Sequence, residues 1–409
     1  MSEDVSEDGR IAGSVSVTAQ TVPQTDEERR AAALLDLDAK APDAAATLAG
    51  ARDRLLARAR GEEKPAPLPW PSLAEAFGGG LWPGLTVLVG GTGTGKTQLA
   101  LEVALHAAKR GCPVLYVGLE LEARGVSSRL AALLDPDRRV HWSDLYLGTM
   151  TPGDAAEVLD RAEAELKGVP LRLEFAPPYG WSYDLLRERV RALATRHADL
   201  LGGPPRLPPL VVLDFLQLVS GPRDAEGRPL PGTERQDLRE RIQQAAYAAR
   251  ASAMEHDAAV LLLSSTARTN YGALTLNGGH KDAPKDEDLE RIDPERWLGT
   301  GKESGEVEYG ADALAVLLTE RVPEGAKPPK GKPLHVLVAK VRAGKPSHVE
   351  LRFVGGTRFA EPDSDERVWR QARADKAALP PRTGKGSEKG KAEAEAERTM
   401  FEHANKVLV

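Results

Sequence analysis

The sequence predicts an α/β fold in which a mostly parallel β-sheet is covered by helices on both faces. Short, continuous apolar runs alternate with helix-permissive stretches along most of the 409 residues, which is typical of strands buried on both faces. The first run, Leu85–Val89, leads into a Gly-rich stretch, Gly90–Thr97, and a helical stretch follows it. A strand, a Gly-rich loop and a helix in this order predict a phosphate-binding loop at one edge of the sheet.

The Gly-rich stretch fits the pattern G-x-x-x-x-G-K-[ST] of a nucleoside triphosphate-binding loop. Glycines let the backbone bend so that its N–H groups point at a phosphate, and the helix N-terminus adds positive potential. Lys96 is expected to reach the β- and γ-phosphates of ATP, and the Thr97 hydroxyl to ligate Mg²⁺. A plain Gly-rich turn is the alternative, which the strand–loop–helix context disfavours. The predicted nucleotide-binding residues are Gly90, Gly91, Thr92, Gly93, Thr94, Gly95, Lys96 and Thr97.

Eight apolar runs are predicted to be strands of a core that spans residues 72–362. They are Leu85–Val89, Val114–Leu119, Leu171–Phe175, Leu210–Leu213, Ala259–Ser264, Ala313–Leu318, Leu334–Val341 and Val349–Val354. The short segment Arg342–His348 joins the last two runs, which predicts an antiparallel hairpin at the C-terminal end of the sheet.

The segments outside this core have a different composition. Residues 1–25 are rich in Ser, Thr, Asp and Glu and are expected to be a disordered acidic tail. Residues 26–71 are expected to form a short helical segment followed by a stiff, Pro-rich linker at Glu62–Pro71. Residues 363–409 are predicted to be a charged, low-complexity tail.

Composition narrows the class of protein. The formal net charge is −6, so no global basic field points to nucleic acid, and any polyanion site has to be local. The single cysteine, Cys112, excludes an internal disulfide and a cysteine-based zinc site. No apolar run has the length of a membrane span, and the acidic N-terminus has no signal region. We therefore expect a cytoplasmic protein without a membrane partner.

Two carboxylates follow apolar runs at the edge where the phosphate loop is expected. Asp214 ends the run Leu210–Leu213 and is placed to hold Mg²⁺ through water, together with Thr97. Glu120 is the first polar residue after the run Val114–Leu119, where it can orient or deprotonate the attacking water. A surface or helix-start glutamate is the alternative for Glu120, and it is the interpretation we favour for Glu122.

Two further patterns lie near strand ends. The run Ala259–Ser264 breaks into Ser265 and Thr266, which are candidates for sensing the γ-phosphate, although hydroxyls at strand ends are more often local caps. Lys340 and Arg342 lie two residues apart on one side of a strand. Both could act on the nucleotide of a neighbouring subunit, with Arg342 as an arginine finger. From the pattern alone, a solvated basic strand end is the simpler interpretation.

Together these stretches resemble the RecA-type ATPase domain of DnaB-like hexameric replicative helicases, and in particular the shorter plasmid RepA type. The resemblance spans residues 72–361, and its most specific parts are Leu213–Leu218 and Glu303–Asp312. It implies a RecA-like fold that binds Mg-ATP through Lys96, Thr97 and Asp214. It also implies Glu120 as the base, with Lys340 and Arg342 reaching across a ring interface.

The sequence departs from this family at two places. The sensor strand ends Ser264-Ser265, where the family commonly has Ser-Gln or Ser-His, and a serine makes fewer contacts. We expect the folded N-terminal domain of the family to be missing, although residues 1–65 could supply a helix that docks on the next subunit. The two loops that would line a DNA channel are 220–234 and 269–300, where Arg223, Arg228, Lys281 and Lys285 are diluted by acidic residues.

The sequence thus predicts an Mg-ATP-hydrolysing DNA translocase or helicase in DNA replication, which forms a homo-oligomeric, hexameric ring around single-stranded DNA. The alternative is a RecA-like ATPase that uses the nucleotide as an assembly switch in repair, recombination or regulation, without unwinding DNA. The serine at the sensor position and the mixed charge of the loops favour the alternative. The family resemblance favours the helicase.

Overall fold

The structure is a computed structural model. It describes residues 43–136, 140–175, 181–197, 206–224, 228–231, 233, 236–266, 274–276, 307, 310–320 and 331–362. The chain divides into two compact units, residues 1–62 and residues 63–409. The predicted tails, residues 1–25 and 363–409, lie outside the described residues.

The described part of the first unit is the helix α2 (Ala44–Ala59) and the residues next to it. Asp43 caps this helix, since its Oδ1 accepts a hydrogen bond of 2.7 Å from the backbone N–H of Ala46. None of the residues of α2 is buried. Leu48, Leu55 and Leu56 are exposed on it, with 65%, 53% and 42% of their surface accessible. This helix therefore presents exposed apolar side chains.

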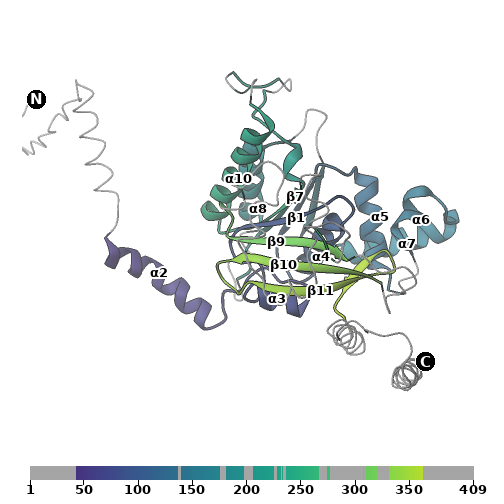
Figure 1. Ribbon diagram of the computed structural model, residues 1–409, viewed down its shortest axis with the longest axis horizontal. Coiled ribbons are helices and arrows are strands. Elements are labelled where there is room, and N and C mark those ends of the chain that lie inside the picture. Colours follow the sequence, from purple (N-terminus) through teal and green to yellow (C-terminus); the bar gives the residue numbers. More distant parts are fainter. Residues whose placement is uncertain are drawn as a thin grey trace, which may run out of the picture. The chain divides into compact units, whose positions relative to one another are not determined.

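The second unit is built on one sheet, and β1 lies at its centre between β7 and β9 (Figure 1). The strand order is β12-β11-β10-β9-β1-β7-β5-β2-β3, and β8 pairs with β9 outside this path. The parallel strands are β1 (Gly84–Gly90), β2 (Val114–Gly118), β3 (Leu171–Phe175), β5 (Leu210–Asp214), β7 (Ala259–Ser265), β8 (Thr275–Leu276) and β9 (Ala313–Glu320). The antiparallel strands are β10 (Lys332–Val341), β11 (Ser347–Val354) and β12 (Arg358–Ala360).

All eight predicted strands and the C-terminal hairpin are therefore confirmed. The sequence did not predict β8, β12 or the two-stranded sheet of β4 (Trp181–Ser182) and β6 (Val219–Ser220). Each of these strands has only two or three residues, which is too short for an apolar run or an alternating pattern to be recognised.

Helices cover both faces of the sheet. Successive residues of β1 point to opposite faces, so this strand contributes apolar side chains to a core on each side. Leu88 packs in the core shared with α4 (Lys96–Lys109) and α5 (Ala123–Leu134). Val87 and Val89 pack in the core shared with α8 (Tyr183–Arg196) and α10 (Leu238–Glu255). Among the described residues, the other helical elements of this unit are α3 (Pro71–Ala76), α6 (Trp142–Leu147), α7 (Pro152–Leu166) and the short η1 (Leu216–Leu218).

The structure differs from the prediction at the Pro-rich linker, because residues 63–71 belong to the second unit. Ala66, Leu68 and Trp70 are buried in its core. The backbones of Ala66 and Leu81 exchange two hydrogen bonds of 2.9 Å. The three buried residues alternate with their neighbours, which is the period of an extended segment with one face on a core. The prolines obscured this pattern, since they are compatible with both a linker and an edge segment.

In the part of the chain that the structure describes, no helix combines the length and the apolar character needed to cross a membrane.

Candidate nucleotide-binding site

The phosphate loop follows β1, and its backbone shape depends on glycine at Gly93 and Gly95. Both have positive φ, +75° and +92°, in a region that other residues rarely adopt. Gly95 is also the N-cap residue of α4. A side chain there would place its Cβ 2.8 Å from the ring of Phe359, so glycine also leaves room for this ring. No side chain of a described residue caps the start of α4. Its first N–H groups are therefore available to a phosphate.

Lys96 folds back across the loop. Its Nζ donates hydrogen bonds of 2.8 Å to the carbonyl oxygens of Gly90 and Gly91. The Thr94 hydroxyl donates a hydrogen bond of 2.9 Å to the same Gly91 carbonyl. These bonds hold the ammonium group at the mouth of the loop, where a bound triphosphate would place its β- and γ-phosphates.

Asp214 ends β5 and is almost fully buried, with 1% of its surface exposed. The Tyr116 hydroxyl donates a hydrogen bond of 2.6 Å to its Oδ2. Burial raises the pKa of Asp214, while Tyr116, Thr97 and Lys96 oppose this shift. The pKa of Tyr116 is raised as well, by burial and by the charge of Asp214. The carboxylate is thus held in one orientation by a buried phenol.

The residues present fit a magnesium ion. Asp214 Oδ1 is buried, and no hydrogen-bond partner of suitable geometry is found for it among the described residues. Thr97 also stabilises the charge of this carboxylate. A carboxylate and a hydroxyl are the hard oxygen ligands that Mg²⁺ prefers beside nucleotide phosphates. The predicted pair Thr97 and Asp214 is therefore brought together at this edge of the sheet.

Glu120 lies next to this pair. Gly118 is the register partner of Asp214, and the N–H of Leu119 donates a hydrogen bond of 2.7 Å to the Asp214 carbonyl. Partial burial of Glu120, together with the charge of Asp214, raises its pKa, and Lys96 and Arg129 oppose the shift. A raised pKa suits a group that accepts a proton near neutral pH. Glu122, in contrast, forms an exposed ion pair of 3.0 Å with Arg124.

The sequence patterns did not predict two residues of the site, Tyr116 and Arg129. Tyr116 had a visible signal, because it is a polar-tipped residue within the otherwise apolar β2. Arg129 lies on α5, and its charge acts on both Asp214 and Glu120. Its Nη1 donates a hydrogen bond of 2.7 Å to Gly125 O, and its Cζ lies 3.7 Å from the centre of the Trp142 ring. The sequence gives no signal for Arg129, because a helical arginine is usually solvated.

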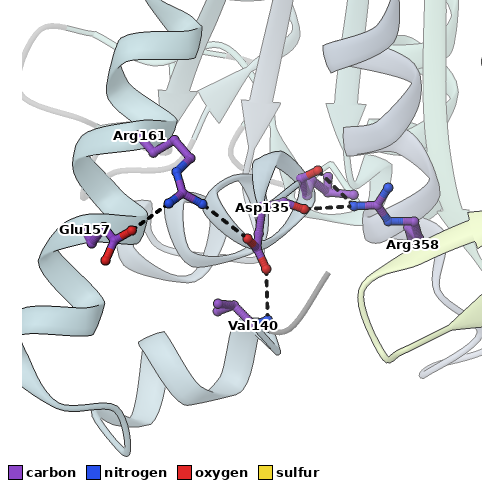
Figure 2. Close-up of polar contacts among 6 residues, drawn as sticks. Asp135, Val140, Glu157, Arg161 and Arg358 are labelled. Atoms are coloured by element: carbon purple, nitrogen blue, oxygen red, sulfur yellow. Dashed lines mark hydrogen bonds and ion pairs between the residues drawn. The ribbon is translucent and has the colours of Figure 1, made fainter. Parts of the chain in front are cut away.

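The C-terminal end of α5 is fixed by two arginines (Figure 2). Asp135 accepts a hydrogen bond of 3.1 Å from the Val140 N–H and lies 3.7 Å from Arg161 Nη1. Arg358 of β12 donates to the carbonyls of Leu133 and Asp135, at 3.3 Å and 3.5 Å. These contacts satisfy carbonyls that a helix end leaves open. The helix that carries Arg129 is therefore tied to β12.

The end of β7, which is the predicted sensor strand, is connected to η1. Gln217 Nε2 donates a hydrogen bond of 2.9 Å to Ser264 Oγ, and Gln217 Oε1 accepts one of 3.2 Å from the Ser265 N–H. Thr266 is buried, and its hydroxyl has no hydrogen-bond partner among the described residues. The structure thus links Ser264 and Ser265 to the segment that follows Asp214.

Lys340 and Arg342 lie at the opposite end of the sheet from the phosphate loop. Val341 pairs with Ala313, which pairs with Thr86 near the start of β1. Arg342 Nε forms an ion pair of 3.0 Å with Asp312, whose other oxygen accepts a 2.8 Å hydrogen bond from the Leu85 N–H. From Leu85 to Gly90 the strand advances about 17 Å. The two cations therefore cannot serve the phosphate loop of their own subunit.

The residues proposed to line a DNA channel are only partly described. Residues 267–273 and 277–306 lie outside the described residues, and they include Lys281 and Lys285. In the other loop, Arg228 forms an ion pair of 2.8 Å with Asp224. Arg223 forms an isolated antiparallel β-bridge with Pro229.

The comparisons with known proteins agree with this geometry. A search of curated protein sequences finds no match. A solved structure described as an ATPase domain is 19% identical, has a TM-score of 0.59, and covers 79% of this chain and 100% of its own. A structure of "A DnaB-Like Replicative Helicase And Its Interactions With Primase" is 18% identical, has a TM-score of 0.57, and covers 83% of this chain and 72% of its own. At these identities the two structures establish the fold.

The family model of the DnaB-like helicase C-terminal domain matches residues 72–361, which is most of the chain. The matched range includes the phosphate loop, both carboxylates and the hairpin with Lys340 and Arg342. The chain therefore belongs to the DnaB-like helicase C-terminal domain family and carries its ATP-hydrolysing helicase domain.

Proposed function

We propose that this chain is an Mg-ATP-hydrolysing DNA translocase or helicase that works as a ring in DNA replication. The observation that carries the proposal is the convergence of Lys96, Thr97, Glu120 and Asp214 at one edge of the sheet. Asp214 raises the pKa of Glu120 and Lys96 lowers it. Thr97 and Lys96 both act to lower the pKa of Asp214. Family membership supports ATP hydrolysis and helicase activity. The roles of individual residues, the metal, the ring and the DNA are our proposal.

The chemistry follows from these positions. The phosphates of ATP bind to the N–H groups of the loop and of the first turn of α4, and Lys96 turns from the carbonyls of Gly90 and Gly91 to the β- and γ-phosphates. Thr97 and Asp214 would hold Mg²⁺, which would supply positive charge to the phosphates. Glu120 accepts a proton from the water that attacks the γ-phosphorus. The bond from that phosphorus to the β–γ bridging oxygen breaks, and ADP leaves.

The position of Lys340 and Arg342 supports a ring. Arg342 is 60% exposed, and Asp312 holds it at the far end of the sheet. Burial and the neighbouring Arg342 lower the pKa of Lys340, so the two cations lie close together. In a ring whose subunits follow one another head to tail, this end of one subunit faces the phosphate loop of the next. Both cations then complete the site of the neighbour, where an arginine stabilises the charge of the transition state.

The exposed leucines of α2 support a further contact between subunits. A helix with uncovered apolar residues gains free energy by burying them against another chain. Deletion of residues 1–60 tests this contact. We expect the shortened chain to lose ring formation in sedimentation velocity, and rings of unchanged stability would contradict the contact.

Single-stranded DNA is the proposed partner of the ring. The test is steady-state ATP hydrolysis by the purified chain with and without single-stranded DNA, with Lys96→Ala as the blank. We expect hydrolysis that DNA strongly stimulates, that high salt suppresses, and that the blank lacks. Hydrolysis that is indifferent to DNA would contradict the translocase and favour the assembly switch.

A further inference from the structure

The short strand β12 lies directly against the helix that follows the phosphate loop. Gln98 Nε2 donates a hydrogen bond of 2.6 Å to the Thr357 carbonyl. Glu102 Oε1 accepts one of 2.8 Å from the Phe359 N–H. Gln98 and Glu102 are four residues apart and therefore share one face of α4. Gln98 and Glu102 thus bind the backbone of one segment, at Thr357 and at Phe359.

The segment is coupled to the loop through the Phe359 ring. This ring fills the space beside Gly95 that a Cβ would occupy. It also packs against Trp70 and Phe353, with ring centres 6.2 Å and 4.9 Å apart, and Trp70 Nε1 donates a 3.1 Å hydrogen bond to the Phe359 carbonyl. Because protein interiors are close-packed, a shift of β12 has to move this ring and the wall of the phosphate loop with it.

Glu102 is an unusual residue for this contact, since it is buried with only 9% of its surface exposed. Burial raises its pKa to about 8, while the Phe359 N–H and the charge of Arg358 oppose the shift. Arg358 directs its Nη2 to the carbonyls at the end of α5 (Figure 2). One turn further along α4, burial and Arg110 lower the pKa of His106 to about 4, so this neighbour is neutral. The Glu102 carboxyl group is therefore mostly in its neutral form at pH 7.

We propose that Glu102 is a positioning residue of the nucleotide site, which holds β12 and Phe359 against the phosphate loop through its hydrogen bond to the Phe359 N–H. The inference rests on the proposed nucleotide binding. When Glu102 loses its proton, a buried charge remains with too few partners, and the segment has to move to admit water. Nucleotide binding then weakens, because the binding geometry of the loop depends on the wall that Phe359 forms.

The test is the affinity for ADP, measured by calorimetry on the full chain at pH 7 and pH 9. Four forms are compared: the native chain, Glu102→Gln, Glu102→Ala and Glu165→Gln. The glutamine keeps the oxygen that accepts from Phe359 but cannot ionise. Glu165 is the matched control, since it contacts α4 through Lys109 at 2.6 Å in an exposed ion pair, away from β12.

Between pH 7 and pH 9, the affinity for ADP should fall about fivefold more in the native chain and in Glu165→Gln than in Glu102→Gln. This difference corresponds to a modest coupling between Glu102 and the nucleotide site. Glu102→Ala is expected to bind weakly at both. An equal pH dependence in the native chain and Glu102→Gln would overturn the inference, because the glutamine retains the tether. Absence of ADP binding by the native chain would instead contradict the proposed nucleotide site, and this inference with it.

Discussion

Tyr116 and Asp214 lie on neighbouring strands, and the phenolic oxygen is 2.6 Å from Asp214 Oδ2. The phenol thus stabilises the ionised carboxylate and fixes its orientation, while the buried Oδ1 has no hydrogen-bond partner of suitable geometry among the described residues. A carboxylate that is held by one oxygen and keeps the other for a ligand is arranged for metal binding.

The first prediction concerns Tyr116→Phe, which removes this hydrogen bond and little else. The pKa of Asp214 should rise further, so the requirement for Mg²⁺ should increase and ATP hydrolysis should fall by about tenfold. The free energy of unfolding should fall by about 1.5–3 kcal/mol, because a buried charge loses a partner. Magnesium titrations of the hydrolysis rate and urea denaturation measure both effects. An unchanged magnesium requirement would contradict the role of the phenol.

Asp214→Asn is expected to separate stability from activity. Burial raises the pKa of Asp214 above its unfolded value, so its ionisation destabilises the fold progressively as the pH rises above about 4. The asparagine removes this cost and should raise the melting temperature at pH 7, while hydrolysis is lost. Differential scanning calorimetry of both forms at pH 5 and pH 7 tests the sign. A lower melting temperature of the variant at pH 7 would show that the carboxylate stabilises the fold.

The ionisation of Glu102 should also lower the stability of the fold, at a higher pH than that of Asp214. Its pKa is about 8 in the folded chain and about 4.5 in the unfolded one, so the folded state binds the extra proton between these values. Stability should therefore fall as the pH rises from about 4.5 to 8, by up to about 4 kcal/mol in the native chain relative to Glu102→Gln. Urea denaturation of the two forms at pH 5, 6.5 and 8.5 measures the difference. Parallel stability profiles would exclude the shifted pKa.

Arg342→Ala should lower the turnover number by about 10³-fold, as expected for an arginine finger. It should leave the fold almost unchanged, because the Arg342 side chain is 60% exposed and its ion pair with Asp312 contributes less than about 1 kcal/mol. Steady-state kinetics and thermal unfolding of the variant test both parts. A large loss of stability would mean that Arg342 mainly supports the junction between β1 and β9.

Much of the fold could be predicted from the sequence, because its strands are continuous apolar runs and its phosphate loop has a specific pattern. Asp214 and Glu120 could be placed, since residues that follow parallel strands meet at one edge. The far position of Arg342 follows from the antiparallel hairpin.

The contacts of β12 and Arg129 could not be predicted. A strand of three residues is too short to show an alternating pattern of apolar residues. The sequence of α5 does not show which of its charged side chains faces the site. The burial of the segment around Trp70 could not be predicted either, because its alternation of buried and exposed residues is short and interrupted by prolines. These parts depend on packing between residues that are far apart in the sequence.

Complementation between Lys96→Ala and Arg342→Ala tests most directly whether two subunits share one site. Alone, each should be nearly inactive, the first because its phosphate loop fails and the second because it completes no neighbouring site. When the two are mixed and allowed to exchange subunits, some interfaces combine an intact loop with an intact Arg342. We predict that single-stranded DNA then stimulates ATP hydrolysis well above the sum of the two separate rates. A mixture no more active than that sum would contradict a site shared between subunits.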